Sequence, residues 1–120
     1  MLRVIDGLPD GAVGIEAHGR VTRSERARVL QPRLDAALAD GGRIRLLYVA
    51  GEDFAGYEGG GVFDDAVFGS RHFNAFQKIA FVADDGPWDR AVAALDGLMP
   101  AAVRTFAPRE LAAAKAWLAA

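Results

Sequence analysis

The chain has 120 residues, a formal net charge of −2 at neutral pH, a hydrophobic fraction of 52% and no cysteine. We expect residues 1–120 to form a single domain with a substantial core, because the chain is long enough and apolar enough to exclude disorder. Without cysteine the chain has no disulfide, thiolate metal site or cysteine nucleophile, and its small negative charge argues against nucleic acid as a partner. No segment reaches the roughly 18–20 apolar residues of a membrane span, so we expect a cytoplasmic protein whose association with membranes is at most peripheral.

The first twenty residues have the pattern of two short strands joined by a turn. Residues 2–6 are mostly apolar, and the Pro-Asp-Gly sequence at 9–11 favours a turn. Residues 12–19 then alternate between apolar and small or polar side chains, which places Glu16 and His18 on the wet face. We therefore predict a hairpin whose second strand lies at the edge of the sheet and exposes His18.

A helix is predicted from Thr22 to about Asp40. Thr22 and Glu25 match a capping box, in which each side chain bonds the other residue's backbone amide. Pro32 lies inside this helix, where it should remove a hydrogen bond and cause a kink. The glycines at 41–42 are typical of a helix end.

The remainder of the chain alternates between strands and helices. Residues 43–50 are apolar without alternation, which is typical of a central parallel strand covered on both faces. The order ββαβαβαβα predicts an α/β fold: a five-stranded, mostly parallel sheet with one antiparallel edge strand and helices on both faces. The further strands are expected at 79–83 and 102–106, and the further helices at 59–76, 87–98 and 108–118.

Several short stretches, in this order along the whole chain, resemble one family of small bacterial proteins. The stretches are Gly7–Asp10, Gly19–Thr22, Ile44–Tyr48, Gly69–Phe73 and Leu98–Pro100 followed by Ala116–Leu118. As a set they resemble the SpoIIAA-like family, which is related to the STAS and CRAL-TRIO folds. The resemblance implies a β-α superhelix without established catalytic activity. It also implies an apolar ligand, or membrane association, through a mobile helical region on one side of the sheet.

One departure from the wider STAS group concerns regulation by phosphorylation. Anti-sigma-factor antagonists of that group carry a phosphorylatable serine where the central strand meets the next helix. Here residues 51–61 contain neither serine nor threonine. A partner switch driven by a kinase is therefore not expected.

Six of the eleven aromatic residues lie between positions 54 and 76. At about 100° per residue, a helix over 59–76 directs one stripe to the core, whereas Val67 and Phe68 fall well outside it. The surplus of apolar side chains indicates a lipid, a membrane or a protein partner. The stripe assigned to the core comprises Val62, Ala66, Gly69, Phe73 and Phe76.

The three glycines Gly59, Gly60 and Gly61 precede this aromatic helix. We interpret them as a hinge that lets the helix move and open an apolar pocket, because adjacent glycines are costly to order. A phosphate-binding Walker A loop is excluded, because Tyr57 and Glu58 stand where lysine and serine or threonine are required.

The pocket itself is expected at the carboxyl end of the central strand, the edge where open α/β sheets usually bind ligands. Glu52 and Asp53 follow that strand and would form the rim. The candidate ligand-binding residues are Phe54, Tyr57, Phe63, Val67, Phe68, His72 and Trp88.

A catalytic alternative would use Asp53, Asp64 or His72 as general acid or base. The spacing of these residues does not match a metal-binding motif, and a solvated helix face explains them as well. We therefore assign no catalytic residue, cofactor or metal.

The leading hypothesis is a non-catalytic domain that binds an apolar small molecule or lipid between the sheet and the helix 59–76. That helix would also make peripheral contact with a membrane. The alternative is a protein–protein interaction module, either a homodimer or a regulatory partner, in which the same aromatic side chains form the interface.

Overall fold

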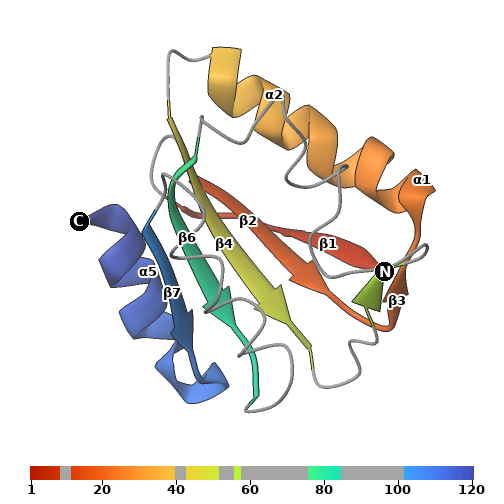
Figure 1. Ribbon diagram of the computed structural model, residues 1–120. Helices are drawn as coiled ribbons and strands as arrows, with labels where there is room; N and C mark the ends of the chain where they lie inside the picture. Colours follow the sequence, from red (N-terminus) through yellow and green to blue (C-terminus); the bar gives the residue numbers. More distant parts are fainter. Residues whose placement is uncertain (9–11, 40–42, 52–55, 58–75, 85–101) are drawn as a thin grey trace.

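The computed structural model describes residues 1–8, 12–39, 43–51, 56–57, 76–84 and 102–120. Within these residues a five-stranded sheet has the strand order β1-β2-β4-β6-β7 (Figure 1). Its first pair is antiparallel and the other three pairs are parallel, which confirms the predicted fold class. The strands are β1 (Leu2–Ile5), β2 (Ala12–Ala17), β4 (Ile44–Ala50), β6 (Phe76–Val82) and β7 (Ala102–Phe106).

Helices pack on both faces of this sheet and divide its core into two clusters. One cluster includes Leu30 and Leu34 beneath the first helical run, and the other includes Ala114 and Leu118 of the C-terminal helix. On the first face the rings of Tyr48 and Phe81 stack 5.7 Å apart. The helical segments are α1 (Arg23–Glu25), η1 (Arg26–Leu30), α2 (Gln31–Ala39), η3 (Pro108–Glu110) and α5 (Leu111–Ala119).

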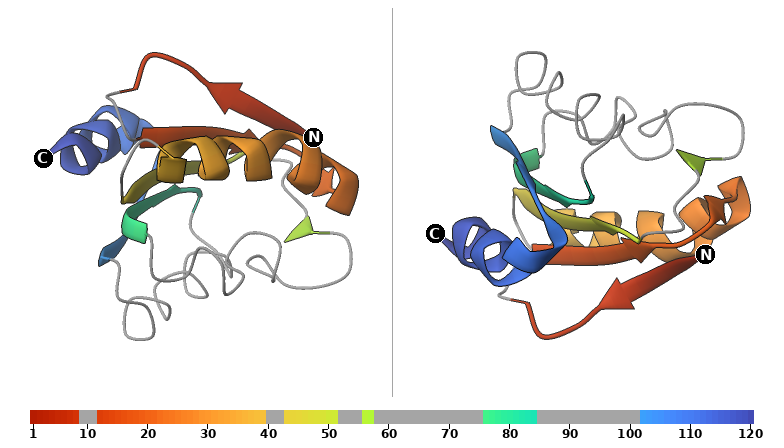
Figure 2. Two further views of the ribbon diagram at one scale, coloured as in Figure 1. Left: turned by 90° about the horizontal axis from the view of Figure 1, so that it is seen from above. Right: turned by 90° about the horizontal axis from the view of Figure 1, so that it is seen from below.

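The edge strand beside β2 is β1, so β2 itself is not at an edge of the sheet. Strand β2 lies between β1 and β4, with Gly14 aligned to Ile5 on one side and to Leu47 on the other. Figure 2 shows β1 at the margin of the sheet. The prediction of β2 as an edge strand is therefore wrong. The polar residues at the carboxyl end of β2 line a cavity and do not mark the border of the sheet.

Strand β6 begins earlier than predicted and contains a bulge. Ile44 aligns with Phe76, but Arg45 aligns with Lys78, so Gln77 is an extra residue. The bulge allows Phe76 and Ile79, three positions apart, to face the same core cluster. The prediction that Phe76 ends a helix is wrong in its secondary structure: Phe76 is buried, as expected, but in a strand.

A second, two-stranded sheet was not predicted. Strand β3 (Arg20–Val21) pairs in parallel with β5 (Gly56–Tyr57), and both lie outside the strands expected from the sequence. The turn at 9–11 and the predicted helices 59–76 (before Phe76) and 87–98 lie outside the described residues.

The predicted capping box begins the first helical run. The Glu25 amide donates to Thr22 Oγ1 (3.1 Å), and the Thr22 amide donates to Glu25 Oε1 (3.2 Å). The other carboxylate oxygen of Glu25 accepts from the amide of Leu2 (2.9 Å), which ties the helix start to β1. Burial alone would raise the pKa of Glu25, but the hydrogen bonds from Thr22 and Leu2 outweigh it and lower that pKa below its ordinary value.

Pro32 is accommodated directly after a wide π-helical turn, η1. In a regular α-helix the ring of Pro32 would clash with the carbonyl of Arg28 and leave it without a donor. A wider turn relieves that clash, which accounts for an irregular helix at the position where the sequence predicted a kink.

Two cations of the sheet hold the end of helix α5. Lys78 Nζ donates to the carbonyl of Trp117 (2.9 Å), and Arg45 Nη1 donates to the carbonyl of Leu118 (2.9 Å). Lys78 Nζ also lies 5.2 Å from the centroid of the Trp117 ring. These contacts satisfy carbonyls that lack helical partners and place positive charge at the negative end of the helix dipole.

We predict that Glu25→Gln lowers the free energy of unfolding by about 1 kcal/mol at pH 7, because the charged capping bonds are lost. A carboxyl group with a lowered pKa in the folded state stabilises the protein above its unfolded pKa of about 4.3. That stabilisation is lost as the pH falls through the lower, folded-state pKa. Urea unfolding at pH 7 and at about pH 3 should therefore show a difference between the two proteins that shrinks in acid, and an equal difference at both pH values would contradict the role of Glu25.

We predict that Lys78→Met destabilises the protein by about 1 kcal/mol, because the Trp117 carbonyl and ring lose their cation. Lys115→Met is the matched control, since Lys115 is exposed on α5 itself. Urea unfolding of both variants is the measurement. A loss of stability as large in the control as in Lys78→Met would show that net charge, and not the contact with α5, is responsible.

Candidate functional site

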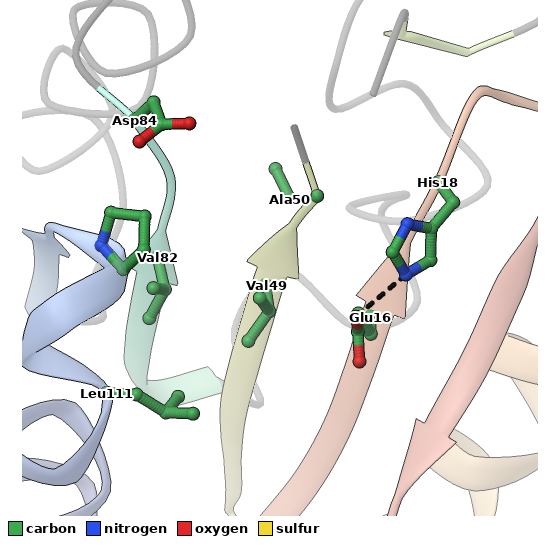
Figure 3. Close-up of a pocket in the computed structure, with 9 residues that line it drawn as sticks. Glu16, His18, Val49, Ala50, Val82, Asp84 and Leu111 are labelled. Atoms are coloured by element: carbon green, nitrogen blue, oxygen red, sulfur yellow. Dashed lines mark hydrogen bonds and ion pairs between the residues drawn. The ribbon is translucent and has the colours of Figure 1, made fainter. Parts of the chain in front are cut away.

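A cavity of about 540 Å³ lies at the carboxyl ends of β2, β4 and β6. Its side walls come from the strand ends and from the start of the C-terminal helical segment (Figure 3). It lies at the edge of the sheet where ligands are expected in open α/β folds. The described residues that line it are Glu16, His18, Val49, Ala50, Gly51, Val82, Asp84, Pro108 and Leu111.

The direction of helix α5 explains why this part of the sheet is hollow. The last carbonyls of α5 bond Arg45 and Lys78 near the amino ends of their strands, whereas its first residue, Leu111, lines the cavity. The helix therefore runs antiparallel to the strands and packs mainly on β6 and β4. Helix α5 does not cover the carboxyl end of β2, so the Glu16 side chain faces the cavity although β2 is an inner strand.

One wall of the cavity is a hydrogen-bonded pair. His18 Nε2 lies 2.7 Å from Glu16 Oε1, and the two side chains are 28% and 33% exposed. An ionised carboxylate only accepts hydrogen bonds, so we assign the proton of this bond to Nε2. The imidazole therefore fixes the orientation of the Glu16 carboxylate beside the cavity (Figure 3).

The His18 ring packs directly against the backbone of Gly51. The Gly51 amide donates to the carbonyl of Ala17 (2.8 Å), which extends the pairing of β4 with β2 by one residue. A Cβ atom at position 51 would lie 2.6 Å from His18 Nδ1 and 3.1 Å from the Ala17 carbonyl oxygen. Only glycine allows the backbone and the imidazole to approach so closely.

The opposite wall carries Asp84, which follows β6 and is exposed. The amide of the preceding residue, Ala83, donates to the carbonyl of Phe106 (3.1 Å), so the end of β6 stays beside β7. The apolar side chain of Val49 lies between the two walls, and Val82 lies below Asp84 on β6 (Figure 3). The cavity thus has an apolar floor with a carboxylate on either side.

The described lining residues combine apolar surface with two carboxylates and one imidazole. The described part of the chain contains no group of three or more histidine, aspartate, glutamate or cysteine residues that could hold a metal ion. None of the described lining residues is a serine, threonine, cysteine or lysine nucleophile. What this arrangement can do is bury an apolar group and accept hydrogen bonds at Glu16 and Asp84.

The ligand-binding residues predicted from sequence are not placed by the structure. Phe54, Phe63, Val67, Phe68, His72 and Trp88 lie outside the described residues, as do Glu52, Asp53, Asp64 and the proposed hinge Gly59–Gly61. Tyr57 contributes its backbone to β5, and its side chain is outside the description. These assignments remain predictions.

Sequence reasoning missed the residues that do line the cavity. The sequence places Glu16 and His18 on one face of a strand, but an edge strand with one face in solvent explains such a pair without a cavity. Val82 ends strand β6 and Asp84 follows it, and the neighbours of this strand in space are distant in sequence. The one signal in the sequence is that the carboxyl ends of parallel strands meet at one edge of the sheet. This signal locates the site but does not identify the side chains that line it.

Among the comparisons with known proteins, a family model identifies the family and a solved structure shares the fold. The SpoIIAA-like family model matches residues 12–119 of this chain. Among solved structures, an uncharacterized protein from the DUF3478 family, with a SpoIIAA-like fold, from Shewanella loihica PV-4 is similar with a TM-score of 0.73. The two sequences are 20% identical, and the match covers 98% of this chain and 92% of the other. A search of curated proteins gives no match, and within the described residues no helix has the length and apolar character needed to cross a membrane.

We predict that Gly51→Ala displaces the His18 ring, breaks its bond to Glu16 and destabilises the protein by about 1–3 kcal/mol. In the double variant Gly51→Ala/His18→Ala the ring is absent, so the loss should be smaller than the sum of the two single losses. Urea unfolding of the four proteins in this cycle is the measurement. Additive losses would show that the imidazole does not depend on the glycine.

Proposed function

This chain belongs to the SpoIIAA-like family, and from that premise we propose that it is a non-catalytic domain that binds a small molecule or lipid with an apolar body. The ligand occupies the cavity at the carboxyl edge of the sheet. It is selected by burial of its apolar part on Val49, Val82 and Leu111, while its polar end stays near the carboxylates.

The observation that supports this proposal is the cavity itself. Its volume of about 540 Å³ falls within the range of roughly 300–1,000 Å³ that small-molecule sites occupy. Burying about 250 Å² of apolar ligand surface would gain on the order of 6 kcal/mol before the cost of association is subtracted. The expected affinity is therefore modest, in the micromolar range or weaker, for a ligand of about ten carbon atoms.

The aromatic residues predicted from sequence extend the proposal. Gly51 lines the cavity, and the chain continues from it through Phe54 into the stretch that contains six aromatic residues. These side chains would add apolar contact area to the ligand site, and the segment 59–76 would make the peripheral contact with membranes. A separate role as a protein–protein interface has no support on the described surface, where Met1 is the exposed large hydrophobic residue.

Native mass spectrometry of the purified protein, followed by denaturing extraction, is the direct test. We expect an adduct of a few hundred daltons that extracts into organic solvent. Leu111→Trp should abolish it, because the indole fills the cavity from the α5 side. Ala112→Trp is the matched control, since Ala112 is the next residue of the same helix and is exposed.

Added decanol gives the same test for protein that is purified without a ligand. We expect calorimetric binding to the wild type and to Ala112→Trp, but none to Leu111→Trp. A protein that carries no adduct and binds no decanol would refute the proposed function, as would equal binding by the two tryptophan variants.

A further inference from the structure

We infer that the ligand of this cavity carries a protonated amine beside its apolar body. This inference rests on the proposed function and specifies the chemical class of the ligand. It follows from the charges that face the cavity, from the way one of them is held, and from the apolar floor between them.

The charged groups can be followed element by element. Strand β2 contributes Glu16 and, just beyond its end, His18, and the end of β6 contributes Asp84. Strand β4 contributes Val49 and Ala50, and Gly51 follows it. The C-terminal helical segment contributes Pro108 and Leu111, and none of these five residues carries a charge. Among the described lining residues, the formal charge is thus −2 with a neutral imidazole and −1 with a protonated one.

The two carboxylates are also available to a ligand. Glu16 uses Oε1 in its bond to His18, and its side chain remains a third exposed. Asp84 is exposed, and within the described part of the chain no arginine or lysine forms an ion pair with it. Arg109 belongs to a neighbouring hollow together with Asp84, but it does not line this cavity.

The two carboxylates lie on opposite walls, with Val49 on the strand between them and Val82 below Asp84 (Figure 3). An ammonium group near either wall gains a charge-assisted hydrogen bond, whereas a carboxylate or phosphate at the same place is repelled. A hydroxyl group gains a hydrogen bond without the charge. The Gly51–His18 contact holds Glu16 in place before binding, so little conformational entropy is lost when the ammonium group arrives.

The experiment compares decylamine, decanol and decanoate by isothermal titration calorimetry at pH 7 and low salt. These probes share one alkyl chain and differ in the charge of their head group. We expect decylamine to bind about tenfold more tightly than decanol, and decanoate to bind most weakly. Added salt should weaken the binding of decylamine but not that of decanol.

Two isosteric variants test the carboxylates. Glu16→Gln and Asp84→Asn should each weaken decylamine binding roughly three- to fivefold, as expected for a partly exposed ion pair, and leave decanol binding unchanged. Asp35→Asn is the control: it removes the same charge from an exposed position on α2, which packs on the opposite face of the sheet. It should change neither affinity.

The outcomes separate this inference from the proposed function. Equal binding of the amine and the alcohol, blocked by Leu111→Trp, would overturn the inference and leave the cavity as an apolar site. Tightest binding of decanoate would overturn it as well. Absence of binding for all three probes would refute the proposed function and the inference together.

An ammonium group can come from a soluble amine or from a lipid head group. Sedimentation with phosphatidylethanolamine vesicles distinguishes the two sources. Binding to these vesicles that is weakened by Glu16→Gln and Asp84→Asn supports the lipid head group. Binding of decylamine without binding to vesicles supports a soluble amphipathic amine.

Discussion

The parallel alignment of β2, β4 and β6 is the constraint on which the rest of the structure depends. Parallel ladders bring the carboxyl ends of all three strands to one edge, so residues separated by more than sixty positions in sequence meet there. The antiparallel strand β1 completes the sheet on the far side of β2 and makes β2 an inner strand. The polar pair Glu16 and His18 therefore lies at the carboxyl end of an inner strand, where it lines the cavity.

The C-terminal helix decides how large that cavity is. Arg45 and Lys78 hold its last turn at the amino end of the sheet, and its nine residues span about 13 Å at the usual helical rise. Helix α5 therefore begins beside Val82 and not over Glu16. The stability of the helix end and the openness of the site thus depend on the same two cations, although neither cation touches the cavity.

Local sequence signals predicted much of the fold. The capping box of Thr22 and Glu25, the uninterrupted apolar run of β4 and the five residues of β7 all specify their structures through near neighbours. The position of β2 could not be read in this way, since its alternation is compatible with an edge or with a cavity wall. The packing of the His18 ring against Gly51 is likewise a contact between residues 33 positions apart. Composition and local spacing cannot predict such a contact.

The bulge at Gln77 determines which side chains of β6 face the core beneath α2 and which face the core beneath α5. Before it, Phe76 faces the core beneath α2; after it, Ile79 and Phe81 do so, while Lys78 turns toward α5. Deleting that one residue from the gene would leave Phe76 two positions before Ile79, and regular alternation would then keep both side chains on the same core face. Strand β6 can therefore lose its extra residue and keep both cores, whereas deleting a residue between Ile79 and Val82 would move core side chains to the opposite face of the sheet.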